Sequence, residues 1–189
     1  MFADCYNLKE INLNFNTQNV EKMNSLFSRS YSLKKIDLSS FKTDKVIKMT
    51  SMFSDCMSLE EIIFDPEKFK TITVDCMGYM FYNCNNLKLS KLNSFDTEKV
   101  KYMNSMFSKC EKLIDIDLSN FNNKSVENIN NMFDCCKNLK KIDLSSFRDN
   151  CYKFNNIFDN CPSLEEVKVK DENMIKKFKK EYEKINFKI

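Results

Sequence analysis

The cysteines are the residues whose type and spacing most invite chemistry in this chain. There are nine, and six recur at similar intervals, at Cys5, Cys56, Cys84, Cys110, Cys136 and Cys161. Structural zinc usually takes closely spaced Cys and His ligands, but the chain has no His and no Cys-x-x-Cys pair, so we expect no metal site. Regular spacing favours a column of small apolar side chains inside a core.

Disulfides are the alternative for these thiols, because equivalent cysteines in adjacent structural units would approach the separation that a disulfide accepts. Cys84 with Cys110 and Cys110 with Cys136 would then compete. An odd number of cysteines, and Ser30 at one position of the column, argue against an obligatory disulfide framework. Buried thiols are favoured, and a reducing compartment or deep burial explains them equally well.

The residue inventory offers little for catalysis. Without His there is no Ser-His-Asp or Cys-His arrangement, and a single glycine, Gly78, excludes the phosphate-binding glycine motifs. Adjacent carboxylates such as Glu60 and Glu61 point in opposite directions along an extended segment and do not converge on a substrate. We therefore expect no catalytic residue, no cofactor site and no enzymatic activity.

The cysteines belong to a longer repeat. A Met-Phe-like pair recurs seven times at spacings of 25, 26, 28, 26, 26 and 25 residues, beginning at Met1-Phe2 and ending at Ile157-Phe158. Three residues after each Phe stands a Cys, or Ser30, and three further on stands a Leu: Leu8, Leu33, Leu59, Leu87, Leu113, Leu139 or Leu164. The two extra residues of the longest interval fall in 65–68, where a loop can accommodate them.

Each repeat predicts the same local structure. An alternating apolar pair such as Ile116/Leu118 indicates a short strand with one buried face. Val100, Met103 and Met106 then follow at helical spacing, with Thr97 placed to cap a short helix or 3₁₀ turn. Because glycine is so rare, we expect the abundant Asn and Asp residues to make the bends. A unit of about 26 residues cannot close its own core, so the copies must stack as a solenoid.

The run from Cys110 to Phe121, repeated from Cys136 to Phe147, resembles the BspA-like leucine-rich repeats of bacterial surface proteins and Mycoplasma-type lipoproteins. The resemblance covers residues 1 to about 170 and departs mainly at Ser30, Ser90 and the insertion at 65–68. It implies an α/β solenoid, a right-handed leucine-rich-repeat-like coil of seven repeats, each with one short parallel strand and a short helix or 3₁₀ turn. It also implies adhesion at a cell surface or after secretion.

The tail breaks the period after residue 170. Met174, Ile175, Phe178, Tyr182 and Ile185 fall on one side of a helix, and Asp171 can cap it. We expect one domain, with a solenoid over 1–170 and an amphipathic capping helix over 171–189, finished by a strand near its end. A basic helix that binds a membrane surface or a partner is the alternative. Because the chain starts inside a repeat, we expect missing repeats or another chain to pack at the N-terminal end.

Charge and hydropathy limit the partners. The net charge of +3 lies entirely in the last twenty residues, which hold seven Lys and four acids, so residues 1–169 sum to zero. A neutral repeat region does not predict a nucleic-acid surface. No apolar run is long enough to span a membrane, and residues 1–5 lack the basic and apolar regions of a signal peptide. A single glycosylation sequon, Asn123-Lys124-Ser125, is a weak match.

The outward-facing strand positions are the candidate binding site, because core packing does not determine them. They are Lys35, Asp37, Glu61, Ile63, Leu89, Lys91, Asp115, Asp117, Lys141 and Asp143. Their mixed charge suits a protein partner, although a merely soluble sheet face would look the same. The sequence thus predicts a non-enzymatic protein-binding or adhesion module of a surface or secreted protein. The alternative is a cytoplasmic repeat scaffold with reduced, buried cysteines.

Overall fold

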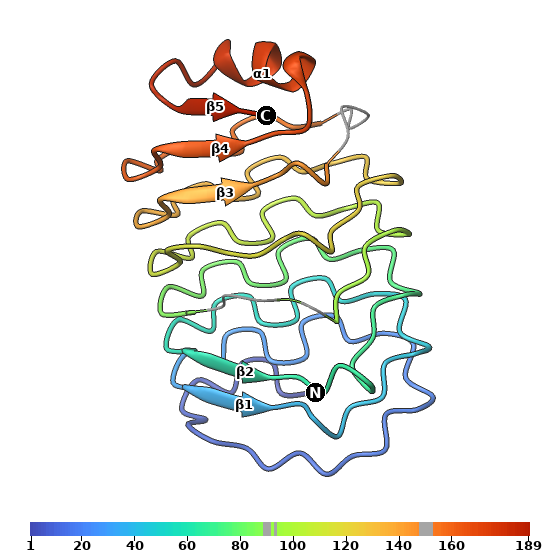
Figure 1. The fold of residues 1–189 in the computed structure, drawn as a ribbon. Coiled ribbons are helices and arrows are strands. Elements are labelled where there is room, and N and C mark those ends of the chain that lie inside the picture. The colour runs from blue at the N-terminus through green and yellow to red at the C-terminus, as the bar shows by residue number, and fades with distance from the viewer. Residues whose placement is uncertain (89–91, 93, 148–152) are drawn as a thin grey trace.

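The coils of the chain stack on one another in a computed structural model that describes residues 1–88, 92, 94–147 and 153–189 (Figure 1). The elements are β1 (Lys35–Asp37), β2 (Glu61–Ile63), β3 (Lys141–Asp143), β4 (Glu166–Lys168), α1 (Glu172–Lys179) and β5 (Asn186–Lys188). The strands form two parallel sheets, β1-β2 and β3-β4-β5, with equivalent repeat positions in register, as in the pairing of Ile36 with Ile62.

The core is built from columns of equivalent residues. One column is an aromatic stack with centroids 5.5 to 6.0 Å apart and rings tilted by 3° to 16°, formed by Phe2, Phe27, Phe53, Phe81, Phe107, Phe133 and Phe158. The repeated Leu residues from Leu33 to Leu139 are also buried. No coil buries these side chains alone, so the apolar surface removed from water belongs to the stack.

The helix or 3₁₀ turn expected after each strand is not formed, which corrects the sequence prediction. In the described part of the chain α1 is the only helix, and the Met-Phe segments are runs of turns. Within the segment from Met23 to Ser30, the amides of Ser28 and Ser30 bond three residues back, to Ser25 and Phe27. The amides of Ser25, Phe27 and Arg29 bond to the next coil instead, so no helical ladder can form.

Left-handed residues generate this alternation. Two residues of nearly every coil have positive φ without being glycine: Asp4, Ser25, Arg29, Ser51, Asp55, Tyr79, Asn83, Ser105, Lys109, Asn131, Cys135, Asn156 and Asn160. The amide of Ser25 bonds Thr50 of the next coil, and that of Arg29 bonds Ser54. These bonds offset the cost of the left-handed conformation. Asn and Asp make only some of the bends, so that expectation holds in part.

The sequence predicts that Thr97 caps a helix, but in the structure Thr97 links two coils. Its hydroxyl donates to the carbonyl of Asn122 and accepts from the amide of the same residue, at 3.0 and 2.6 Å. Thr17 and Thr43 bond their next coils in the same way. Asn123, the next member of this column, is 1% exposed, so the asparagine of the sequon is buried in the folded chain.

Strands form in only some of the repeats that the structure describes. Among the described residues, three-residue strands form in four of the repeats, whereas 11–13 and 115–118 run alongside without becoming strands, contrary to the prediction of one strand in each repeat. The insertion at 65–68 forms a turn in which the amides of Lys68 and Phe69 both bond the Asp65 carbonyl, at 3.1 and 2.7 Å. The turn leaves the Phe69 side chain buried, so the column survives the extra residues.

The tail lies over the last coil. The Asp171 carboxylate caps α1 by accepting the amides of Asn173 and Met174, at 3.0 and 3.1 Å. Met174 and Phe178 are buried, and the Phe178 ring lies 5.7 Å from Phe158, the last ring of the stack. Strand β5 pairs with β4, as Figure 1 shows. Among the described residues, no helix has the length and apolarity to cross a membrane.

The shared core makes a stability prediction. Leu113 is 1% exposed, so Leu113→Asp places a charge among several coils and should lower the free energy of unfolding by more than about 4 kcal/mol. Asp115→Lys, two residues away and exposed, should change it by less than about 0.5 kcal/mol. Urea unfolding followed by circular dichroism measures both. Equal midpoints for the two variants would show that the Leu column does not hold the stack together.

Candidate functional site

The predicted sheet face is exposed, but its residues do not form one continuous surface of free side chains. Lys35 and Asp37 lie on β1, and Glu61 and the half-buried Ile63 lie on β2. Lys141 and Asp143 are exposed on β3, while Asp115 and Asp117 are exposed on a segment outside the strands. Leu89 and Lys91 lie outside the described residues. The described residues therefore give two patches, at β1-β2 and from Asp115 to β3.

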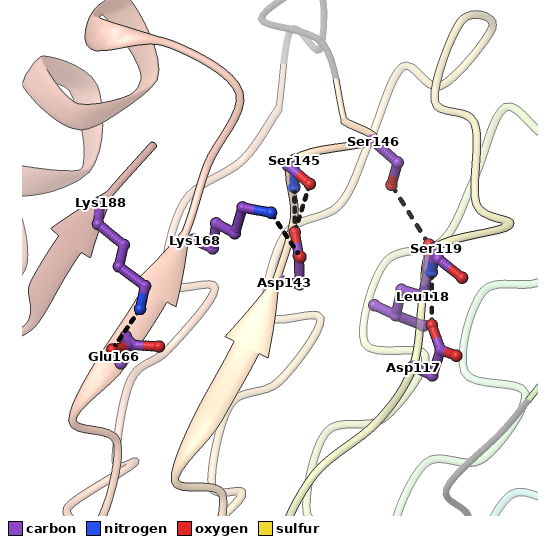
Figure 2. A network of polar contacts seen from close by, with 9 residues as sticks. All are labelled: Asp117, Leu118, Ser119, Asp143, Ser145, Ser146, Glu166, Lys168 and Lys188. Carbon is purple, nitrogen blue, oxygen red and sulfur yellow. Dashed lines mark hydrogen bonds and ion pairs between the residues drawn. The ribbon is translucent and has the colours of Figure 1, made fainter.

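Ion pairs run from coil to coil along this face. Lys35 contacts Glu61 at 2.8 Å, and Lys168 contacts Asp143 at 3.2 Å. Lys188 of β5 contacts Glu166 of β4 at 2.8 Å (Figure 2). Apart from the half-buried Glu166, these side chains are exposed, so each pair contributes little stability, roughly 0 to 1 kcal/mol. The pairs align neighbouring coils and keep the face nearly neutral.

Three of the predicted site residues have a local structural role. The carboxylates of Asp37, Asp117 and Asp143 accept the amide of the serine two residues later, at 2.8, 2.9 and 2.8 Å. Figure 2 shows this for Asp117 with Ser119 and for Asp143 with Ser145. Each bond forms an Asx turn that ends the outward-facing segment. Turn geometry therefore helps to determine the residue type at these three positions, and their role in binding a partner stays a prediction.

The same hydrogen bonds change the acidity of two carboxyls. Hydrogen bonding from Ser39 lowers the pKa of Asp37 below its usual value of 3.8. For Asp143, partial burial raises the pKa, but the bonds from Ser145 and the Lys168 ammonium outweigh it, and the pKa is lowered overall. Both side chains are therefore held ionised as acceptors for the turn. Neither is prepared to donate a proton, which is what a general acid would require.

The cysteine column is also structural. The thiols of Cys56, Cys84 and Cys110 each donate to the carbonyl of the Phe one coil back, at 3.1 Å. Ser30 makes the same bond to Phe2 with its hydroxyl. Burial raises the pKa of Cys56 and of Cys110 to about 12, so these thiols are poor nucleophiles and poor metal ligands at neutral pH. Cys5, Cys76, Cys135 and Cys161 are half-buried, and all eight described cysteines are free.

No group of three or more Cys, Asp or Glu in the described ranges is arranged to hold a metal ion.

One feature that sequence reasoning missed is a column on the coil surface beside the sheet, where Tyr6, Tyr31 and Met57 follow the Cys position and are exposed. The signal was present in the sequence, because the same position is polar in later repeats, at Asn85, Glu111 and Lys137.

Parallel strands, stacked rings and columns that repeat coil by coil define a repeat protein of the leucine-rich-repeat type. The chain matches the family of Mycoplasma proteins of unknown function called DUF285, over residues 1–65 and 61–170, and it belongs to that family. This membership confirms the predicted resemblance to the Mycoplasma-type repeats.

The crystal structure of a leucine-rich repeat protein from Bacteroides ovatus is similar to the chain at 20% identity, with a TM-score of 0.47. The alignment covers 89% of this chain and 51% of that one, so the chain spans about half the length of that protein. No curated protein matches the chain significantly.

The Asx turn makes a pH prediction. The pKa of Asp143 in the folded protein is lowered below the usual value of 3.8. The charge of Asp143 therefore contributes stability in full at pH values above 3.8, and this contribution is lost as the pH falls through the lowered pKa. Asp143→Asn keeps an acceptor but removes the charge. We expect it to cost no more than about 1 kcal/mol at pH 7, and less on acidification. Urea titrations at several pH values measure this, with Asp115→Asn as the control. A cost that grows as the pH falls would contradict the assignment.

The thiol column makes a labelling prediction. With N-ethylmaleimide, we expect the half-buried Cys5, Cys76 and Cys135 to react in the native protein, and Cys56, Cys84, Cys110 and Cys136 to react only after unfolding in urea. Mass spectrometry of the peptides measures each site. Equal native labelling of Cys110 and Cys76, or a disulfide-linked peptide from the column, would show that the buried thiols are not as described.

Proposed function

We propose that this chain is a non-enzymatic protein-binding module, made of seven coils, that presents its sheet face to a protein partner and belongs to an adhesion protein at a cell surface or in the secreted fraction. The stack of coils, which presents its outward-facing side chains along one face, supports the binding role. Stacking at about 4.8 Å for each coil gives a face on the order of 30 Å long, enough for an interface of ordinary size.

One observation carries the proposal. After the core columns and turn acceptors are accounted for, the described face still displays Lys35, Glu61, Asp115 and Lys141 to solvent, and of these Lys35 and Glu61 pair with each other. Neither packing nor turn geometry requires their charges. Alternating acidic and basic side chains around the half-buried Ile63 match the polar rim and apolar centre of protein interfaces better than a phosphate-binding surface, which would be uniformly basic.

An intracellular scaffold is the second candidate, favoured by the free state of all eight described cysteines. A reducing compartment keeps thiols in this state, although burial protects most members of the column anywhere. Membrane-impermeant biotinylation of intact cells that express the natural gene separates the two candidates. Labelling of the protein on intact cells supports the adhesion role, and labelling only after lysis supports the scaffold.

The binding face can be tested with charges exchanged in place. The sheet-swap variant carries Lys35→Glu, Glu61→Lys, Asp115→Lys and Lys141→Glu, which conserves the net charge and the ion pair between 35 and 61. The control swap, Glu98→Lys with Lys124→Glu, exchanges a similar pair, 3.3 Å apart, beyond the Phe95 and Phe121 positions and outside the sheet. Thermal unfolding should be nearly the same for the parent and both variants.

Adhesion is measured with beads coated with each protein on a monolayer of host cells, before and after the cells are treated with protease. We expect the parent and the control swap to adhere, the sheet swap to adhere about tenfold less, and protease treatment to abolish adhesion. Equal adhesion of the parent and the sheet swap would reject the sheet face as the binding surface.

A further inference from the structure

The exposed column of Tyr6, Tyr31 and Met57 is not demanded by the fold. The three side chains are 47%, 37% and 40% exposed. They occupy equivalent positions in adjacent coils, because the amide of Ser32 bonds the Tyr6 carbonyl and that of Ser58 bonds the Tyr31 carbonyl, each at 3.2 Å. Later coils carry Asn85, Glu111 and Lys137 at this position, with Lys137 paired to Glu111 at 2.7 Å. Polar residues therefore satisfy the position.

The two tyrosines form a preorganised surface. Their ring centroids are 5.2 Å apart and the rings are tilted by only 18°. The Tyr6 hydroxyl donates to Asp4 at 3.0 Å, and Asp4 is held by Arg29 at 2.8 Å. Rings restrained in this way lose little conformational entropy when a partner covers them. Tyr, Arg and Met are also residue types that are enriched where proteins bind proteins.

A basic hollow adjoins this column. Its volume is about 400 Å³, and it is lined by Lys9, Glu10, Ser32, Lys34, Lys35 and Ser58. Ser32 and Ser58 directly follow Tyr31 and Met57, so the hollow and the column share an edge. Lys35 is paired with Glu61, whereas Lys9 and Lys34 make no ion pair within the part of the chain that the structure describes. The hollow thus has unpaired positive charge beside apolar surface.

We propose that this surface, the tyrosine column with its lysine hollow, docks an acidic segment of a protein partner, with a carboxylate in the hollow and an apolar or aromatic side chain on Tyr6, Tyr31 and Met57. The inference rests on the proposed function and names the chemistry of the partner. Two free lysines attract a carboxylate, and a peptide side chain supplies the apolar group that the exposed rings and thioether can cover.

The test uses fluorescent synthetic peptides and the full chain. The probe is an acidic peptide with two apolar residues, Gly-Asp-Glu-Phe-Asp-Leu-Glu-Gly. One comparison peptide has serine in place of Phe and Leu, and the other has lysine in place of each acid. Fluorescence anisotropy measures the dissociation constants. We expect the probe to bind with a constant below about 1 mM, and both comparison peptides to bind at least about tenfold more weakly.

The variants assign the site. Tyr31→Asn gives coil two the residue that Asn85 provides naturally, so the fold should be retained, and binding of the probe should weaken about tenfold. Lys34→Glu should weaken it by at least as much. Lys140→Glu is the matched control, because Lys140 occupies the same repeat position and is also exposed, and it should leave binding unchanged. Thermal unfolding checks that each variant is folded.

Several results would overturn the proposal. They are a probe that does not bind, binding that is equally tight for the lysine peptide, or binding that Tyr31→Asn leaves unchanged. A heparin fragment is added as a competitor without apolar groups. If the heparin fragment binds more tightly than the probe, and its dissociation constant is the same for the parent and for Tyr31→Asn, the surface is only a site for anions and the proposal fails.

Failure of this docking surface and failure of the proposed function give different patterns. If adhesion depends on the sheet swap while the peptides do not bind, the module still binds protein and only the acidic segment is wrong. If the peptides bind at Tyr31 and Lys34 while the sheet swap adheres like the parent, the docking surface stands and the sheet-face function falls.

Discussion

The structure depends on how the backbone amides alternate between their own coil and the next. In the second coil, the amides of Ser25 and Phe27 donate to Thr50 and Met52 of the following coil, each at 2.9 Å, while the amide of Leu26 between them bonds Met23, three residues back. Buried backbone groups must be paired, so this pattern sets how far along the chain the next equivalent residue must come. Equivalent side chains then have to stack, and the Phe, Leu and Cys columns follow from it.

The periodic features of the sequence were therefore predictable, and the local geometry was not. Leu113, Phe107 and Cys110 belong to positions that recur about every 26 residues, and each is buried as expected. Val100, Met103 and Met106 are spaced by three, which suits a helix and also suits turns that each close over three residues. The deciding positions are Ser105 and Lys109, which have positive φ. The residue types Ser and Lys do not predict a left-handed conformation. The hydrogen bonds to the next coil impose it.

The candidate binding face shows the limit of periodicity as evidence for function. Asp37, Asp117 and Asp143 recur because each ends its segment with an Asx turn, a structural need that three of the coils share. A residue that recurs is thus explained by the stack before it is explained by a ligand. Departures from the repeat are more informative. Tyr31 stands where Asn85 stands two coils later, so the fold accepts either residue and the aromatic one requires another reason.

The same logic decides what the cysteines are for. The carbonyl of Phe27 accepts the Ser30 amide, and the Cys56 thiol also donates to it, each at 3.1 Å. The position needs a small side chain with one hydrogen to donate, and Ser30 meets that need through its hydroxyl, at 3.1 Å from the Phe2 carbonyl. A redox or metal function would not tolerate this exchange, whereas a buried donor would. The thiols that resemble an active site in the sequence are therefore part of the same hydrogen-bond frame that joins each coil to the one before it.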